Sequence, residues 1–356
     1  MCIRDSPNVS FRALSFTIFI LITVMLDTID NEGFTLSKSS VAIIKGMNPH
    51  QMIKDAFNLL GGLDFVVSSQ DSVLIKPNLC ALKESDTGAT TDPMLVEALI
   101  NLLRDKTSDI SIVESDSGAI DAEVKFAACG YVQLSQRTGV NLINLSKEKL
   151  VDVTIPNALA LKSIKLPKMV MDSDVLINVP KLKVNEITEV TLSLKNVFGL
   201  MPSRFKTKYH RVLDKVIVDL NKVVKSRLAL VDGIVGMEGQ GPIDGDPVKM
   251  NLIVAGLNCV AVDSISASIM GFNPEAVSHI KLANSEGLGE GKLKNISIKG
   301  KNISEVQRKF KMPRSMPLTR RIKFKIIEYD ALLTSPVISE CIEILRYYRR
   351  WKHGLT

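Results

Sequence analysis

Short apolar runs alternate with helical segments along most of the chain, and this alternation constrains the fold more than any other feature. Val41–Ile44, Ser72–Ile75, Ile110–Val113 and Val175–Val179 have the length and composition of buried strands. Between them lie segments whose apolar residues recur at helical spacing. Because such alternation is typical of parallel sheets, we predict an α/β fold: a mostly parallel sheet with helices on both faces, plus a C-terminal amphipathic helix.

Charge separates the end of the chain from its body. The formal net charge is +7, but residues 301–356 hold 13 Lys and Arg against five Asp and Glu, or +8, which leaves −1 for residues 1–300. A near-neutral body disfavours binding to a nucleic acid, which depends on clustered Lys and Arg. We predict three parts, namely residues 1–36, an α/β domain over residues 37–300 and a basic tail over residues 301–356.

The first 36 residues are predicted to lie outside the fold. Residues 13–26 are uncharged and mostly apolar, a run too short to cross a bilayer comfortably. The opening MCIRDS resembles a translated sequencing-adapter remnant. Two interpretations stay open: a spurious extension, or a short hydrophobic leader that associates with a membrane.

Residues 335–351 form the predicted amphipathic helix. Its stripe of apolar residues has Arg346, Arg349 and Arg350 beside it and consists of Val337, Ile338, Cys341, Ile342, Leu345 and Tyr348. One interpretation is a helix docked on the body with its basic face in solvent. The other is a peripheral contact with an anionic membrane or a protein partner.

The five cysteines are scattered without a CxxC spacing. This pattern argues against a disulfide framework, a zinc site and an iron–sulfur cluster. A reducing, cytoplasmic location follows, with membrane association through residues 13–26 or the C-terminal helix as the alternative.

Polar clusters follow the predicted strands, where parallel sheets bind their ligands. Lys76 and Asn78 follow one strand, and Glu114, Ser115 and Asp116 end the next. These groups can bind an anion through the ammonium and the backbone N–H groups, or a hard cation through the acids. The alternatives are a solvated lysine, a turn-forming asparagine and an ordinary helix N-cap.

A second group of candidates follows the strand Val175–Val179. Lys181 and Lys183 come first, and Lys195 and Asn196 lie in the apolar segment VTLSLKNVFGL. Burial would lower the pKa of Lys195 and make it a candidate base or amine nucleophile, unless its side chain reaches solvent. His210 is a candidate proton carrier, although a lone histidine is more often a surface residue.

The segment 232–246 is predicted to be a glycine-rich loop. Asp232 and Glu238 are candidate metal ligands, Glu238 is also a candidate acid–base group, and Gly239 would let the backbone approach a ligand. A structural loop with exposed acids explains the same residues.

Several uncommon motifs occur together in a specific order. They are IKPNL (75–79), TTDP (90–93), SDVLINVPKLK (173–183), TLSLKNVFGL (191–200), VDGIVGMEGQGP (231–242) and AVDSISASIMGFNP (261–274). In these motifs the chain resembles the domain-of-unknown-function 362 (DUF362) family over roughly residues 41–300. Many members of that family carry a ferredoxin-like module with two four-iron clusters, whose cysteines this chain lacks, so no iron–sulfur cluster is expected.

The order of a buried strand, a lysine in an apolar segment and then a histidine is also similar to the nickel-pincer lactate racemase superfamily. That similarity implies a role for Lys195 in holding a cofactor or substrate and one for His210 as a metal ligand or acid–base group. DUF362 relatives commonly have a histidine after the PKLK motif, where this chain has Val184-Asn185. Imidazole ligation at that position is therefore not expected.

We therefore predict an enzyme, an isomerase or an oxidoreductase-associated one, that binds a small carboxylate- or phosphate-bearing ligand at the strand ends. Lys76, Lys181, Lys183 and Lys195 would bind the ligand, and His210 or Glu238 would move protons. A divalent metal stays open as a cofactor. The alternative is a non-catalytic ligand-binding or redox-accessory protein without its own iron–sulfur cluster.

Overall fold

The computed structural model describes residues 39–313 and 336–355. Its strands are β1 (Ser40–Lys45), β2 (Val73–Pro77), β3 (Ile110–Glu114), β4 (Asn141–Asn144), β5 (Leu150–Thr154), β6 (Ser163–Pro167), β7 (Val175–Val179), β8 (Lys181–Asn185), β9 (Glu189–Thr191), β10 (Leu228–Glu238), β11 (Asp246–Gly256) and β12 (Ser297–Gly300). Its α-helices are α2 (Pro49–Leu59), α3 (Pro93–Leu103), α4 (Ala122–Ala128), α5 (Tyr131–Thr138), α6 (Lys168–Asp172), α7 (Ser193–Asn196), α8 (Leu213–Val223), α9 (Cys259–Ile269), α10 (Ser278–Ser285), α11 (Ile303–Val306) and α14 (Pro336–Lys352).

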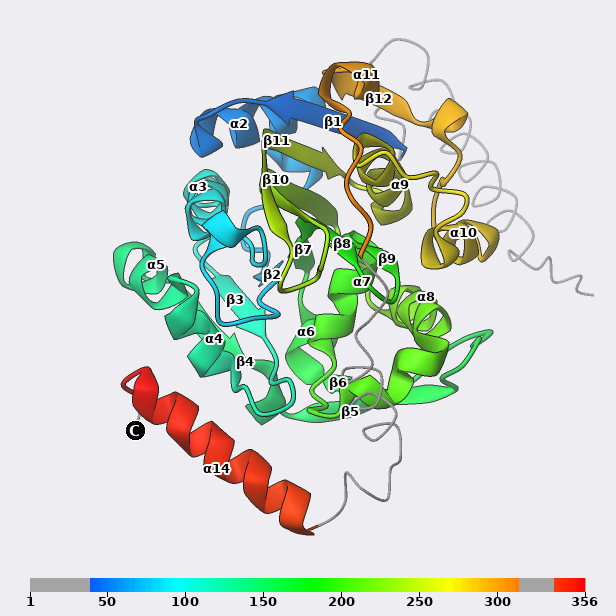
Figure 1. The fold of residues 1–356 in the computed structure, drawn as a ribbon. Coiled ribbons are helices and arrows are strands. Elements are labelled where there is room, and N and C mark those ends of the chain that lie inside the picture. The colour runs from blue at the N-terminus through cyan, green and yellow to red at the C-terminus, as the bar shows by residue number, and fades with distance from the viewer. Residues whose placement is uncertain (1–38, 314–335, 356) are drawn as a thin grey trace, which may run out of the picture. The chain divides into compact units, whose positions relative to one another are not determined.

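The central sheet confirms the predicted α/β fold. Its main path runs β12-β1-β11-β10-β7-β2-β3-β4, and off this path β8 pairs with β10 and β9 pairs with β8. β2 pairs in parallel with both β3 and β7, so the carboxyl ends of these three strands meet at one edge. α2 to α5 cover one face and α7 to α10 cover the other (Figure 1).

Helix starts in the first half follow local sequence signals. Asn48 precedes α2 and accepts hydrogen bonds from the backbone N–H groups of His50 and Gln51. Asp92 precedes α3 and accepts one from Met94. A proline at the first helical position follows each cap, where its missing N–H costs nothing.

The segment 232–246 differs from the predicted loop. β10 and β11 form a long antiparallel hairpin, so the turn is confined to residues 239–245. The glycines within the strand serve close packing: a Cβ at Gly236 would lie 2.7 Å from the backbone oxygen of Leu182, and one at Gly233 2.9 Å from that of Leu252. Glycine at these two positions therefore allows neighbouring strands to pack closely, and it does not indicate a loop there.

The C-terminal helix α14 forms as predicted, but its orientation is the reverse of a helix docked with a solvated basic face. Arg346 Nε donates to Asp121 Oδ1 at 2.9 Å, and Arg349 Nη1 donates to the backbone oxygen of Ala119 at 2.6 Å. Five of its apolar side chains are exposed instead, namely Ile344, Leu345, Tyr347, Tyr348 and Trp351. Residues 1–36, to which the leader or extension was assigned, lie outside the described residues. In the part of the chain that the structure describes, no helix is long and apolar enough to cross a bilayer.

Candidate functional site

A cavity of about 130 Å³ lies at the carboxyl ends of β2 and β3, under the segment from α7 to residue 206. It is lined by Lys76, Asn78, Leu79, Cys80, Glu114, Ser117, Lys125, Lys195, Asn196, Phe198, Gly199 and Lys206. β3 lies on one side of β2, and β7, which comes later in the chain, lies on the other. Ligands bind at such a reversal of strand order in open α/β sheets.

Three lysines surround one carboxylate in this cavity. Lys76 Nζ lies 2.8 Å from Glu114 Oε2, and Lys125 Nζ lies 3.7 Å from Glu114 Oε1; all three side chains are buried. Burial alone would raise the pKa of Glu114, but Lys125, Lys76 and Lys206 together hold it below its usual value. One carboxylate cannot balance three ammonium groups, so the cavity carries excess positive charge.

Lys206 is the third of these lysines and belongs to the 3₁₀ segment Lys206–Val212. Its Nζ donates to Ser115 Oγ at 2.6 Å and to the backbone oxygen of Asp116 at 3.1 Å. Burial and the charge of Lys125 lower the pKa of Lys206 to about 7. This side chain therefore exchanges its proton near neutral pH, and a bound anion would favour its charged form.

Lys195 reaches the same cavity from α7. Burial and the neighbouring charge of Lys183 lower its pKa to about 8. Within residues 39–313 and 336–355, no hydrogen-bond or ion-pair partner faces its Nζ. Burial and the charge of Lys195 also lower the pKa of His210 to about 4, which makes the imidazole neutral at pH 7. The pKa of Lys195 is thus lowered as the sequence predicted, and His210 lies near enough to respond to its charge, while the catalytic roles of both residues stay predictions.

An amide network fixes α7 against the sheet. Asn78 Nδ2 donates to Asn196 Oδ1 at 2.9 Å, and Asn196 Nδ2 donates to Asn178 Oδ1 at 2.8 Å. Behind the cavity wall, Lys183 Nζ donates to Asn78 Oδ1 at 2.8 Å. Lys183 therefore holds a cavity residue in place and is not itself part of the lining.

Asp263 on α9 fixes the other end of α7. Its buried carboxylate accepts hydrogen bonds from the backbone N–H groups of Ser193 at 2.8 Å and Leu194 at 2.9 Å, and from Ser193 Oγ. Burial raises the pKa of Asp263 to about 6, so it is still ionised at pH 7. The Asp263 carboxylate on α9 therefore caps α7, and it fixes the position from which the Lys195 side chain extends into the cavity.

Replacing Asp263 with Ala is expected to lower the free energy of unfolding by about 2–4 kcal/mol, because several donors to this carboxylate are left buried without an acceptor. Urea unfolding at pH 7 measures the loss. Glu275→Ala, on the exposed loop before α10, is the control. Equal stability of Asp263→Ala and the control would contradict the capping role.

The remaining candidates at the end of β3 serve the structure around the cavity. Ser115 Oγ accepts from Lys206, whereas the Asp116 carboxylate accepts from the backbone N–H of Ala122 at 2.8 Å and pairs with Arg204. Asp116 thus supports the start of α4, although Asp121 and not Asp116 occupies the N-cap position of that helix. The structure brings Lys76, Asn78, Glu114, Lys195 and Asn196 together in the lining itself.

Lys181 and Asp232 form a separate buried pair outside this lining. Lys181 Nζ lies 2.7 Å from Asp232 Oδ2, and both side chains are fully buried. The same carboxylate accepts the backbone N–H groups of Asp92 at 2.8 Å and Ile234 at 3.0 Å. Both oxygens of Asp232 are therefore engaged within the protein.

Glu238 and Gly239 lie at the tip of the β10–β11 hairpin. Glu238 Oε2 accepts the backbone N–H of Lys311 at 3.1 Å, and Glu238 Oε1 lies 3.6 Å from Arg308 Nη2. Gly239 N donates to the backbone oxygen of Lys311 at 2.9 Å. No group of three or more His, Cys, Asp or Glu side chains gathers at a metal-binding distance among the described residues. The metal and proton-transfer roles of Asp232 and Glu238 stay predictions.

Sequence reasoning missed Lys125 and Lys206. Lys125 sits between Val124 and Phe126 in a buried helix, and a lysine in such a setting is a recognisable signal of a partner. Lys206 has no comparable signal, because Lys208 two residues later also lies between Thr207 and an aromatic residue. Only the fold directs Lys206 to the cavity and leaves Lys208 exposed.

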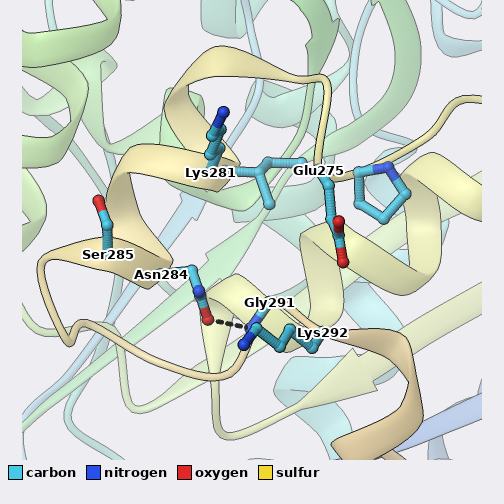
Figure 2. A pocket seen from close by; sticks show the side chains of 8 residues that line it. Glu275, Lys281, Asn284, Ser285, Gly291 and Lys292 are labelled. Atoms are coloured by element: carbon cyan, nitrogen blue, oxygen red, sulfur yellow. Dashed lines mark hydrogen bonds between the residues drawn. The ribbon is translucent and has the colours of Figure 1, made fainter.

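A second pocket, of about 210 Å³, lies beside α10. Figure 2 shows its labelled side chains, with Lys281 and Glu275 pointing in different directions and Asn284 Oδ1 accepting a 2.7 Å hydrogen bond from the backbone N–H of Gly291. Its charged groups do not converge. The lysine-rich cavity is therefore the stronger candidate site.

Comparison with known proteins supports the family resemblance. The profile described as "Domain of unknown function (DUF362)" matches residues 73–268, a range that contains every residue lining the cavity. A protein from Synechocystis sp. named thylakoid-associated protein sll1697 is 29% identical over 238 residues, which cover 65% of this chain and 72% of that protein. Neither finding bears on the similarity to the lactate racemase superfamily, which stays a prediction.

Proposed function

Because the chain belongs to the DUF362 family and the matched region encloses the lysine-rich cavity, we propose that it is an enzyme that binds a small carboxylate- or phosphate-bearing ligand there. The observation that carries this proposal is the gathering of Lys76, Lys125 and Lys206 around the single carboxylate of Glu114. A ligand carboxylate or phosphate would supply the missing negative charge. A volume of about 130 Å³ favours a small ligand over a nucleotide.

Lys195 is the proposed catalytic amine. A pKa of about 8 leaves a minority of the side chains neutral at pH 7, and a neutral amine can accept a proton or attack a carbonyl carbon. His210, neutral at this pH, would assist by exchanging protons. The ligand's charged group would bind among Lys76, Lys125 and Lys206 and so present the rest of the molecule to Lys195.

Thermal shift with small oxyanions tests the proposal. We expect sulfate, phosphate and pyruvate to raise the Tm of the full chain in a saturable way, because ligands that bind only the folded state stabilise it. Lys281→Met, at the pocket beside α10, is the control and should respond as the unchanged protein does. The absence of a saturable shift with all three anions would refute binding at this site.

Anion affinity is expected to fall as the pH rises through about 7. The free protein holds Lys206 at a pKa of about 7, and a bound anion raises it, so binding takes up a proton. Affinity should therefore be greatest below pH 7 and should decline toward about tenfold per pH unit above it. Sulfate is the suitable ligand, because it does not titrate between pH 6 and 9, and isothermal titration calorimetry gives its Kd. A Kd that is constant over this range would contradict the assignment of Lys206.

We also propose a cytoplasmic location beside a membrane. The scattered cysteines are typical of a reducing compartment. The Synechocystis relative carries the words "thylakoid-associated" in its name, which supports a position at a membrane surface.

A further inference from the structure

The exposed side of α14 is unusually apolar and aromatic. Ile344, Leu345, Tyr347, Tyr348 and Trp351 are 47–67% exposed. At helical spacing these five positions occupy one side of the helix, and the rings of Tyr348 and Trp351 lie 6.1 Å apart. This is a continuous stripe and not a scatter of single apolar residues, so it calls for a partner.

The opposite side of α14 is already occupied. Asp121 accepts a hydrogen bond from Arg346 Nε at 2.9 Å and lies 3.5 Å from Arg350 Nη1. Arg349 Nη1 donates to the backbone oxygen of Ala119. A surface helix normally buries its apolar stripe against its own domain. Here the guanidinium groups make the contact with the domain, and nothing within residues 39–313 and 336–355 covers the stripe.

We propose that this stripe is a membrane-interface surface, which inserts between the headgroups of an anionic lipid bilayer. Tyr and Trp favour the boundary between headgroups and acyl chains, and they make up three of the five exposed side chains. Residues 301–356 carry a net charge of +8, and the basic residues among them other than the three arginines that contact the domain would attract anionic lipid. The stripe would be the surface that binds the membrane at the location proposed above, and this role is independent of the cavity and its ligand.

The same charge argues against a second copy of the chain as the occupant. A symmetric dimer through α14 would bring two tails of +8 together, and like charges facing each other at an interface are unfavourable. An anionic bilayer would contact the apolar stripe with its acyl chains and attract the basic residues with its headgroups.

The chain's single tryptophan, Trp351, lies within the stripe and reports directly on insertion. We expect the emission of the full chain to shift to shorter wavelength when vesicles of phosphatidylglycerol and phosphatidylcholine are added. Brominated lipids should quench it. Because the apolar stripe provides the hold, part of the binding should survive a salt concentration that screens the basic residues.

Ile344→Ser/Leu345→Ser keeps the tryptophan reporter and is expected to weaken partitioning into these vesicles by at least about tenfold. Met94→Ser, an exposed apolar residue on α3, is the matched control and should bind as the unchanged chain does. If Ile344→Ser/Leu345→Ser binds vesicles as tightly as the unchanged chain does, the stripe is not the membrane-binding surface, while the proposed membrane-side location stands. An absence of vesicle binding by the full chain would overturn both. A blue shift that depends on protein concentration without lipid would identify a second copy as the occupant and would also overturn the proposal. Sulfate affinity, measured in parallel, reports on the cavity alone.

Discussion

Replacing Lys206 with Met should weaken the binding of sulfate by about 30- to 100-fold, the effect of losing one charge-assisted hydrogen bond in a buried site. The same substitution should raise the Tm of the ligand-free protein at pH 6–7. Burial lowers the pKa of Lys206 from 10.5 to about 7, so the unfolded chain binds this proton more tightly than the folded one. The charge on Lys206 therefore lowers the free energy of unfolding. The full loss is present below pH 7, and it becomes smaller as the pH rises toward 10.5.

Loss of binding together with a gain in stability distinguishes a functional lysine from a structural one. Lys208→Met is the matched control, because Lys208 is exposed and lies only two residues away. Calorimetry with sulfate gives the affinities, and thermal unfolding without ligand gives the Tm values. If Lys206→Met binds sulfate as tightly as Lys208→Met does, Lys206 has no part in the site.

Replacing Lys181 with Met should lower the free energy of unfolding by about 3–5 kcal/mol. Lys181 and Asp232 are both fully buried and 2.7 Å apart, so removing the ammonium leaves a carboxylate with only backbone donors inside the protein. The Asp232 side chain would then have to take up a proton or admit water, and each of these costs stability.

Urea unfolding of Lys181→Met and of Lys181→Met/Asp232→Leu measures this effect. The double variant should recover a large part of the loss, since it removes the unpaired charge and keeps the volume apolar. Sulfate affinity should stay unchanged in Lys181→Met, because this pair lies outside the cavity lining. A Lys181→Met protein as stable as the unchanged chain would show that the pair does not support the fold.

The sheet and much of the cavity could be predicted because they follow from local pattern. The apolar runs ending at Ile75 and Val113 identified β2 and β3, and parallel strands bring the residues after them to one edge. Lys76, Asn78 and Glu114 meet there for that reason. Lys195 and Asn196 could be connected with them because an ammonium in an apolar segment needs either a partner or a cavity.

The remaining assignments depended on contacts between distant parts of the chain. Lys181 pairs with Asp232, 51 residues later, and this pairing exists only because β8 lies beside β10. Glu238 is drawn to Arg308 and Lys311 by the return of the chain after α11. Pattern within a single sequence carries no information about such partners, so candidates with equal chemistry could not be separated.

Crystals soaked in sodium selenate would show whether an oxyanion binds among the cavity lysines, since selenium locates an oxyanion by its anomalous scattering. We expect the strongest peak inside the cavity, within hydrogen-bonding reach of Lys206 and close to Lys76 and Lys195. That peak should be absent from crystals of Lys206→Met. Selenate found only at surface lysines, or only beside the arginines of α14, would contradict an anion site at the ends of β2 and β3.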